Sequence, residues 1–254
     1  KGDIFTIYTD LYNYTFYDAV RELAQKIGIT LQKINYKQSE KINNVKKILA
    51  TATAWYMQNL ELKDIPSCKE YLKKRNLSDN TIRKFKLGFS YNPKTTLLEH
   101  LKSKSFDEND IIKSNVVKFD NKNKLKDYFY KRLIFPIMDE RSNVVGFGGR
   151  TLDGSNPKYI NSPESDYFQK RYLLYNLSNA KIAARKKNNL LICEGYMDVV
   201  SLYEKGIESV VAPLGTALTE QQLCLAWKHC FKPTIMFDGD SAGSRAAYKT
   251  ALMS

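Results

Sequence analysis

The sequence predicts an α/β protein in which a mixed α+β segment precedes a parallel-sheet segment of the β-α-β-α-β type. Three observations predict this class. Apolar, strand-like runs occur at 190–193, 210–212 and 234–237. Helical patterns at 197–205 and 219–230 separate these runs, and strands that alternate with helices form parallel sheets. Upstream, mainly helical patterning gives way to two adjacent strand-like runs, which places a mixed segment first.

Residues 1–29 form one predicted unit whose clearest feature is a helix. Residues 4–8 fit either a strand or the start of a helix. Thr15 can cap a following helix in which apolar residues recur at helical spacing, and Gly28 ends it. Residues 30–44 are mostly polar, which predicts a linker.

The next segment, residues 45–188, is predicted to be a basic α+β subdomain. Two helical patterns occupy residues 45–74, and further lysine-rich helices follow. Two strand-like runs at 133–137 and 144–147 come next, joined by a polar turn. Residues 189–254 then contain the parallel-sheet segment.

The chain is strongly basic, with 40 Lys and Arg residues against 27 Asp and Glu residues and a formal net charge of +13. An excess of this size favours polyanionic partners such as nucleic acids, because each neutralised phosphate releases condensed counterions. Apolar residues make up 43% of the chain, which is enough for at least one buried core at this length.

The cysteines and the absence of long apolar runs indicate the compartment. None of the four cysteines forms a CxxC pair with metal spacing, so we expect free thiols in a reducing compartment. No apolar run reaches the roughly 20 residues of a membrane helix, and the first residues do not resemble a signal peptide. We therefore expect a cytoplasmic protein without a membrane partner.

Two acidic turns directly follow predicted buried strands. Glu194 follows the first strand of the parallel segment, and Asp238 and Asp240 follow the third. Because the carboxyl ends of parallel strands line one edge of a sheet, these three side chains are expected to lie together. Grouped carboxylates repel one another unless a cation neutralises them, and hard oxygen ligands suit Mg²⁺ or Mn²⁺ better than zinc. Glu194 alone is better explained as an acidic residue at a helix amino terminus, and only the combination of turns is specific.

The acidic turns resemble those of the Toprim domain, which primases, topoisomerases and some nucleases share. The finer resemblance is to bacterial replicative DNA primases of the DnaG type, and it covers nearly the whole chain. The segments that carry it are EGYMDV at 194–199, LGTALT at 214–219, DGDSAG at 238–243, RLIFPI at 132–137, GFGGR at 146–150, PKYINSPE at 157–164, FQK at 168–170 and LYNL at 174–177. In the last segment, Asn176 stands where the family has glycine.

The resemblance implies a DNA-directed RNA polymerase of the primase type, a nucleotidyltransferase that makes short RNA primers on single-stranded DNA for replication. It implies that Glu194, Asp238 and Asp240 are catalytic and hold Mg²⁺ or Mn²⁺. Glu194 is then either a ligand or the group that handles the proton. It also implies that residues on the matching segments bind the nucleotide and the template. These residues are Arg132, Arg150, Lys158, Asn161 and Lys170. Asn161 either contacts a nucleotide or holds a turn, and Lys131 is treated as an ordinary surface residue.

The same resemblance implies partners and further domains. The expected partners are a single-stranded DNA template, ribonucleoside triphosphates and a replicative helicase, the last through a carboxyl-terminal domain absent from this sequence. Residues 1–29 resemble a remnant of the family's zinc ribbon without its cysteines, so Zn²⁺ is expected only in the full-length protein. Residues 189–254 resemble a Toprim domain truncated before a further acidic motif. We expect the core to be monomeric.

Two other functions compete with this interpretation. Another Toprim phosphotransfer enzyme, such as a metal-dependent nuclease, would share the carboxylates but not the RLIFPI, GFGGR and PKYINSPE segments. Because the metal site is expected to be incomplete in this sequence, the chain could also be an inactive module that only binds single-stranded DNA and nucleotides. Metal-dependent synthesis of a dinucleotide by this chain would exclude the second alternative.

Overall fold

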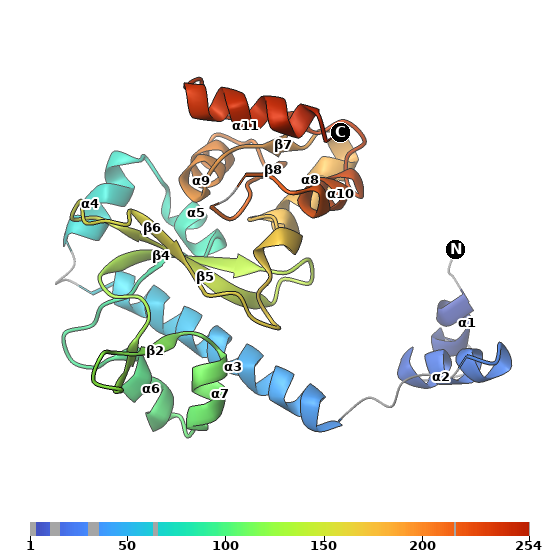
Figure 1. The fold of residues 1–254 in the computed structure, drawn as a ribbon, viewed down its shortest axis with the longest axis horizontal. Coiled ribbons are helices and arrows are strands. Elements are labelled where there is room, and N and C mark those ends of the chain that lie inside the picture. The colour runs from blue at the N-terminus through green and yellow to red at the C-terminus, as the bar shows by residue number, and fades with distance from the viewer. Residues whose placement is uncertain (1–3, 11–15, 30–35, 63–65, 216, 254) are drawn as a thin grey trace. The chain divides into compact units, whose positions relative to one another are not determined.

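The chain divides into two compact units, Lys1–Lys41 and Ile42–Ser254, and each is described by itself (Figure 1). All strands of the described residues belong to the second unit. The computed structural model describes residues 4–10, 16–29, 36–62, 66–215 and 217–253.

The first unit contains two short helices, α1 (Ile4–Asp10) and α2 (Phe16–Lys26). Residues 4–8 are therefore helical. As predicted, α2 ends at a glycine: Gly28 has φ of +70°, and the N–H of Ile29 donates to the carbonyl oxygen of Ala24 at 2.8 Å. Glycine enters this left-handed region without a Cβ penalty, so it ends the helix. The predicted cap, Thr15, lies outside the described residues.

The longest described helix, α3 (Tyr36–Leu60), differs from the linker predicted for residues 30–44. Residues 36–44 are helical, and residues 30–35 lie outside the described part of the chain. The polar stretch contains no glycine or proline and is rich in Lys, Gln and Glu, which favour helix. Polarity alone therefore did not distinguish a linker from a helix. Among the helices that the structure describes, none is long and apolar enough to cross a membrane.

The second unit continues with short helices and strands. In chain order after α3 the elements are α4 (Pro66–Lys74), α5 (Asp79–Lys84), β1 (Gly88–Phe89), α6 (Leu97–Ser103), α7 (Glu108–Lys113), β2 (Val117–Phe119), β3 (Leu125–Asp127), β4 (Arg132–Met138), β5 (Val144–Thr151), β6 (Tyr159–Asn161), the 3-10 helix η1 (Lys170–Tyr172), α8 (Leu177–Lys187), β7 (Leu191–Ile192), α9 (Tyr196–Glu204), β8 (Val210–Val211), α10 (Glu220–Trp227), β9 (Thr234–Ile235) and α11 (Ser241–Ala251).

An antiparallel sheet with the strand order β1-β4-β5-β6 forms the first layer of this unit. The GFGGR segment lies in β5, and its glycines allow close packing. A Cβ on Gly146 would lie 2.6 Å from the ring of Phe168, and a Cβ on Gly148 would lie 2.7 Å from the ring of Tyr196. Real Cβ atoms do not approach other heavy atoms so closely, so glycine lets these aromatic rings rest on the sheet.

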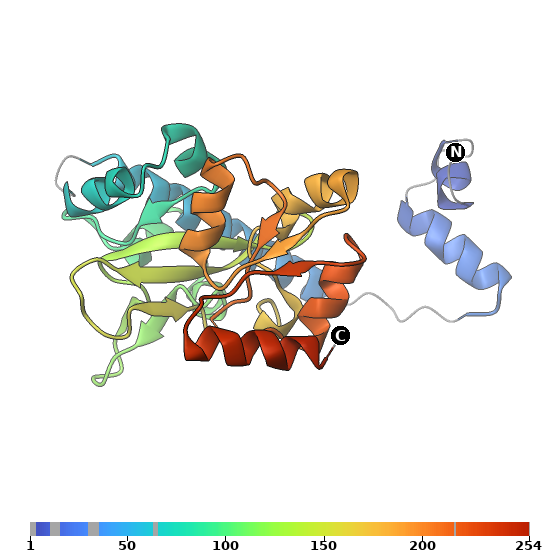
Figure 2. The same ribbon diagram turned by 90° about the horizontal axis from the view of Figure 1, so that it is seen from above.

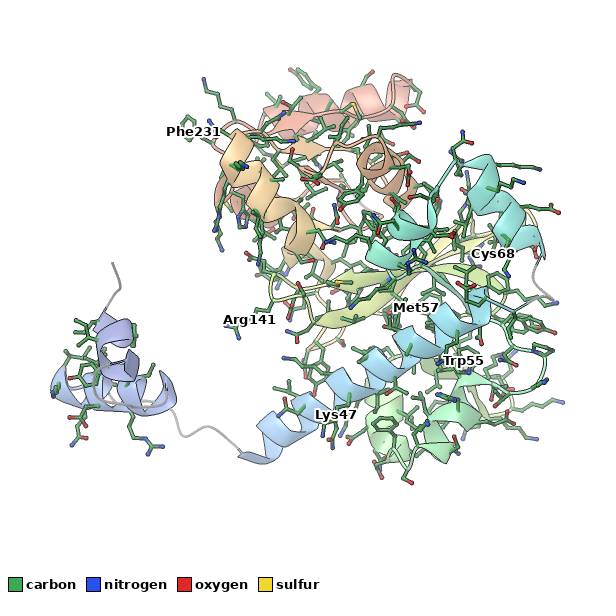
Figure 3. All side chains as sticks on the ribbon, turned by 180° about the vertical axis from the view of Figure 1, so that it is seen from behind. Lys47, Trp55, Met57, Cys68, Arg141 and Phe231 are labelled. Atoms are coloured by element: carbon green, nitrogen blue, oxygen red, sulfur yellow. The ribbon has the colours of Figure 1, made fainter. Side chains whose placement is uncertain are left out.

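Helix α3 packs one face against this sheet (Figure 3). Its buried residues recur at intervals of three and four, which places them on a single helix face. Their partners in the same core include Ile134 and Phe147 of the sheet. Burial of each large apolar side chain contributes roughly 1.5–3 kcal/mol, so this face fixes the helix. The buried residues of α3 in this core are Val45, Ile48, Leu49, Ala52, Trp55 and Tyr56.

A second, parallel sheet has the strand order β8-β7-β9, which confirms the predicted β-α-β-α-β arrangement. Leu191 of β7 pairs with Val210 of β8 on one side and with Thr234 of β9 on the other. The first strand along the chain is therefore central, and the third is its direct neighbour. This order brings the turns after β7 and β9 to the same sheet edge.

The two sheets share a hydrophobic core. Phe135 of β4 stacks on Tyr196 of α9, with ring centroids 5.2 Å apart and an interplanar angle of 15°. Tyr175 meets Tyr196 edge to face at 4.8 Å and forms a backbone bridge with Ala212 beside β8. A single cluster of buried residues includes Leu133 and these side chains. The parallel sheet is thus held directly against the antiparallel one.

Candidate functional site

The two acidic turns meet at the carboxyl ends of β7 and β9. Glu194 follows β7, and its Oε1 atom accepts a hydrogen bond from the backbone N–H of Asp238 at 2.9 Å. Glu194 is half-buried and Asp238 is exposed. Because β7 and β9 are parallel neighbours in register, the turns that follow them lie side by side at the same edge of the sheet. Two of the three predicted metal ligands therefore come together.

The third predicted ligand, Asp240, caps helix α11. Its Oδ1 atom accepts hydrogen bonds from the N–H groups of Ala242 at 2.9 Å and Gly243 at 2.7 Å. An aspartate cap satisfies backbone donors that a helix leaves free at its amino terminus. Asp240 thus orients the start of α11.

Gly243 is the position that leaves room for this turn. A Cβ built there would lie 2.1 Å from the carbonyl oxygen of Asp238 and 2.8 Å from Oε1 of Glu194. No side chain fits at that distance, because the nearest atom belongs to the backbone. The last glycine of DGDSAG therefore permits the contact between the two acidic turns.

A further carboxylate, Asp198, lies in the first turn of α9 and was not predicted as a site residue. Its Oδ2 atom accepts a hydrogen bond from the N–H of Gly195 at 2.9 Å. Burial raises the pKa of this carboxyl group above its usual range, and the negative charge of Asp238 raises it further. The signal in the sequence was its position three residues after Gly195, where an acidic side chain in the first turn of a helix can accept the N–H of the cap residue.

The carboxylates do not form a complete metal-binding cluster by themselves. Among the residues that the structure describes, no group of three or more His, Cys, Asp or Glu side chains lies closely enough to hold a metal ion. The chemistry of the donors nevertheless fits a hard cation, because all are carboxylate oxygens. Burial raises the pKa of Asp198 most, and the charge of Asp238 contributes to the same direction, as expected for neighbouring carboxylates.

Arg150, at the end of GFGGR, lies between aromatic rings close to the start of α9. Its guanidinium is 4.2 Å from the ring centroid of Tyr71 and 5.6 Å from that of Tyr159. The Nε and Nη1 atoms are buried, and neither has a hydrogen-bond partner among the described residues. Arg75 also lies here, because its guanidinium is 5.4 Å from the ring centroid of Tyr71. Neither Tyr71 nor Arg75 was predicted from the sequence.

Arg132, by contrast, is used to hold a loop. Its Nη1 atom donates to the carbonyl oxygens of Pro157 at 3.0 Å and Lys158 at 3.4 Å. The side chain of Lys158 is exposed on this loop. Lys170 lies on η1, where its carbonyl oxygen accepts a hydrogen bond from Gln222 of α10 at 2.9 Å. The predicted basic residues therefore differ in what they contact.

Asn161 joins three of the motif segments. Its Oδ1 atom accepts a hydrogen bond from the hydroxyl of Tyr196 at 2.5 Å, and its Nδ2 atom donates to the carbonyl oxygen of Leu214 at 3.0 Å. Both ends of the amide are thus used within the protein. These bonds link β6 to the start of α9 and to the LGTALT segment. Of the two roles left open for Asn161, the observed contacts favour the structural one.

Tyr196→Phe is expected to lower the free energy of unfolding by about 1 kcal/mol, the typical net value of one hydrogen bond. The substitution removes the hydroxyl that bonds Asn161 but keeps the ring that stacks on Phe135. Urea unfolding of the purified chain measures the effect. The matched control is Tyr175→Phe, since the buried hydroxyl of Tyr175 has no hydrogen-bond partner among the described residues. Equal losses in the two variants would contradict the assigned role of the Tyr196 hydroxyl.

Comparison with protein families identifies the two segments of the second unit. Residues 55–181 match the model of the amino-terminal domain of the DNA primase catalytic core, and residues 188–253 match the Toprim domain. The first match contains the antiparallel sheet, and the second contains the parallel sheet that carries the acidic turns.

Named relatives and solved structures give the same result. The chain is 36% identical to DNA primase of Clostridium acetobutylicum over 98% of its own length, and 36% identical to that of Campylobacter jejuni over 99%. It spans about 42% of the length of the first of these relatives. The Aquifex aeolicus primase structure, with zinc-binding and RNA polymerase domains, superposes with a TM-score of 0.78 and 32% identity, covering 99% of this chain and 61% of that one. A DnaG primase catalytic domain bound to single-stranded DNA gives a TM-score of 0.76 and 34% identity, covering 84% and 68%.

Fold and site together define a class of protein: a Toprim domain, which carries the acidic turns, follows a primase-type domain that contains the antiparallel sheet. Within that class, the chain belongs to the family of bacterial DNA primases of the DnaG type. Membership confirms the family and the α/β architecture that the sequence motifs predicted. A Toprim domain in a primase core implies the use of a divalent metal ion.

Proposed function

We propose that this chain supplies the catalytic core for template-directed synthesis of short RNA primers on single-stranded DNA. The contact between Asp238 and Glu194 at the ends of β9 and β7 carries the proposal, because it joins the two acidic turns into one site. Family membership supports it, as does the binding of single-stranded DNA by a related DnaG catalytic domain. The reaction is a metal-dependent nucleotidyl transfer.

We assign the metal to Mg²⁺ or Mn²⁺ and its ligands to Glu194, Asp238 and Asp240. A metal ion held by these residues would supply electrostatic stabilisation of the negative charge on the attacking and leaving oxygens. In primer synthesis a 3′-hydroxyl attacks the α-phosphate of the next ribonucleoside triphosphate, and pyrophosphate leaves. Glu194 acts either as a ligand or as the acceptor of the hydroxyl proton. Asp198 holds the N–H of Gly195 and so fixes the turn that presents Glu194.

The substrate anion is proposed to meet Arg150. A guanidinium with buried, unpaired nitrogens is costly unless an anion completes its hydrogen bonds. A triphosphate or a template phosphate offers the oxygen atoms that arginine binds best. Lys158 and Lys170 are proposed to contact nucleotide or template, whereas Arg132 and Asn161 position the segments around them. In this assignment Tyr71 and Tyr159 hold the Arg150 side chain in place.

Residues 1–29 are proposed to belong to a zinc-ribbon domain, and residues 189–254 to the Toprim domain. For the whole protein we propose a replicative helicase as a partner. The core is proposed to act as a monomer in the cytoplasm, at replication forks.

Incubation of the chain with single-stranded DNA, Mg²⁺ or Mn²⁺ and labelled ribonucleotides tests the proposal. We expect short, metal-dependent RNA products that require the template. Metal-dependent shortening of the DNA without RNA products would instead favour the nuclease alternative. If both this chain and the full-length protein bind DNA and nucleotides but form no product, the result would favour the third hypothesis, an inactive binding module.

A further inference from the structure

We propose that the hairpin formed by β2 and β3 is a binding surface for the backbone of single-stranded DNA, separate from the acidic site. The hairpin spans Val117–Asp127, and Figure 2 shows it as the light green projection at the lower left. This inference rests on the proposed function, because it extends the path of the template. It concerns residues that do not belong to the motif segments.

The first observation is charge. Residues 117–131 contain five lysines and two aspartates, a net charge of +3 within one short segment. The side chains of Lys118, Lys122, Lys124 and Lys126 are all exposed. Because neutralisation of DNA phosphates by lysine releases condensed counterions, such a segment favours nucleic-acid binding.

The second observation is that two of these lysines face each other. Lys118 of β2 pairs directly with Lys126 of β3 in the antiparallel register. Like charges at directly opposite positions destabilise a strand pair. A protein that needed only a stable hairpin would gain from a neutral or acidic residue at either position. A phosphate bound between the two lysines would offset the repulsion.

The third observation is that the nearby carboxylates already have other partners. Asp127 accepts hydrogen bonds from the N–H groups of Leu97 and Leu98, at 2.8 and 2.9 Å, at the amino terminus of α6. Asp120 accepts the backbone N–H groups of Lys122 and Lys124 in the hairpin turn, at 2.9 and 3.0 Å. Neither aspartate forms an ion pair with a lysine of the hairpin among the described residues. The positive charge therefore remains available to a ligand.

The fourth observation connects the hairpin to the acidic site. The Lys118 ammonium lies 5.2 Å from the ring centroid of Tyr128, whose hydroxyl donates to the backbone carbonyl oxygen of Asn161 at 3.2 Å. Asn161 in turn bonds Tyr196 at the start of α9. Figure 1 shows the hairpin at the lower left of the unit and α11 at the top, with the antiparallel sheet between them. A strand that reaches from the acidic turns to the hairpin would therefore have to cross β6.

Single-stranded DNA is the occupant that we propose for this surface, because a related DnaG catalytic domain binds single-stranded DNA and the proposed function uses such a template. On the face that carries Lys118 and Lys126, the ring of Tyr128 lies 5.2 Å from the Lys118 ammonium, and an aromatic ring offers a stacking surface for an unpaired base. Cations beside aromatic rings are typical of surfaces that follow a single strand.

The test compares the double variant Lys118→Gln/Lys126→Gln with the unchanged chain. Affinity for a labelled oligothymidine of about 20 nucleotides, longer than a typical single-strand site, is measured by fluorescence anisotropy over a range of salt concentrations. We expect about tenfold weaker binding at 0.1 M salt. The slope of log affinity against log salt should fall by about 1.4, because each lost phosphate contact removes about 0.7 for single strands.

Three further measurements make the result specific. Lys186→Gln/Lys187→Gln, on exposed lysines at the end of α8, is the matched control and should bind as the unchanged chain does. Lys118→Arg/Lys126→Arg should retain affinity. The thermal midpoint of the glutamine variant should be unchanged or higher, since the repulsion is removed. An unchanged salt slope, an equal loss in the control, or a loss confined to duplex DNA would overturn the proposal. Binding is measured without metal or nucleotides, so failure of primer synthesis leaves this readout intact.

Discussion

Asp238→Asn is expected to lower the rate of metal-dependent RNA synthesis by about a thousandfold, which is the range for loss of one charged group that stabilises a transition state. The side chain keeps its shape but loses the charge that would attract a metal ion. The backbone N–H of Asp238, which bonds Glu194, is unaffected by the substitution. Primer synthesis at saturating template and nucleotide concentrations measures the effect.

The thermal midpoint distinguishes lost chemistry from lost structure. Because Asp238 is exposed, the Asp238→Asn variant should unfold at or above the temperature of the unchanged chain. The matched control is Asp79→Asn, an exposed aspartate in the first turn of α5, which should retain full activity. Activity of Asp238→Asn within a factor of ten of the unchanged chain would exclude Asp238 as a metal ligand.

Gly243→Ala is expected to lower the same activity by about a hundredfold, although position 243 contacts no substrate in the proposed mechanism. The new Cβ would lie 2.1 Å from the carbonyl oxygen of Asp238 and 2.8 Å from Oε1 of Glu194. The two acidic turns must then separate by about 1 Å, and a displacement of that size can reduce a rate about a hundredfold. Overpacking is expected to reduce the free energy of unfolding by about 1–3 kcal/mol.

Gly239→Ala is the control for stability, because a Cβ at Gly239 meets no atom within 4 Å. This variant should unfold at the temperature of the unchanged chain. Circular dichroism and thermal unfolding of both variants would establish that each is folded before activity is compared. A Gly243→Ala variant with normal activity would show that the contact between Glu194 and the Asp238 turn is not needed for the reaction.

The sequence predicted the architecture of the parallel segment well because its signals are local. Apolar runs and helical spacing define each element, and the motif turns follow the strands directly. The neighbouring positions of β7 and β9 then follow from the general behaviour of parallel sheets. The approach of Glu194 to Asp238 could therefore be predicted from the sequence.

Other features of the site depend on contacts between residues far apart in the chain. Nothing in the sequence shows that Asn161 uses both ends of its amide within the protein, or that Arg132 holds a loop through backbone carbonyls. Tyr71 lies on α4 and Arg75 follows it. The sequence pattern of this region is weak, so it did not predict that these residues would lie close to Arg150. The start of α3 was missed for a different reason: exposed helical turns and linkers share a polar composition.

The shared core between the two sheets also limits how this protein can move. Phe135 of the antiparallel sheet packs against Tyr196 and Tyr175 on the side of the parallel sheet, and buried residues continue through the junction. Domains that hinge against each other usually meet through smaller and more polar surfaces. Opening this junction would expose a large apolar area to water. We therefore expect a template to enter and leave while the two sheets stay together, with adjustment confined to exposed loops and side chains.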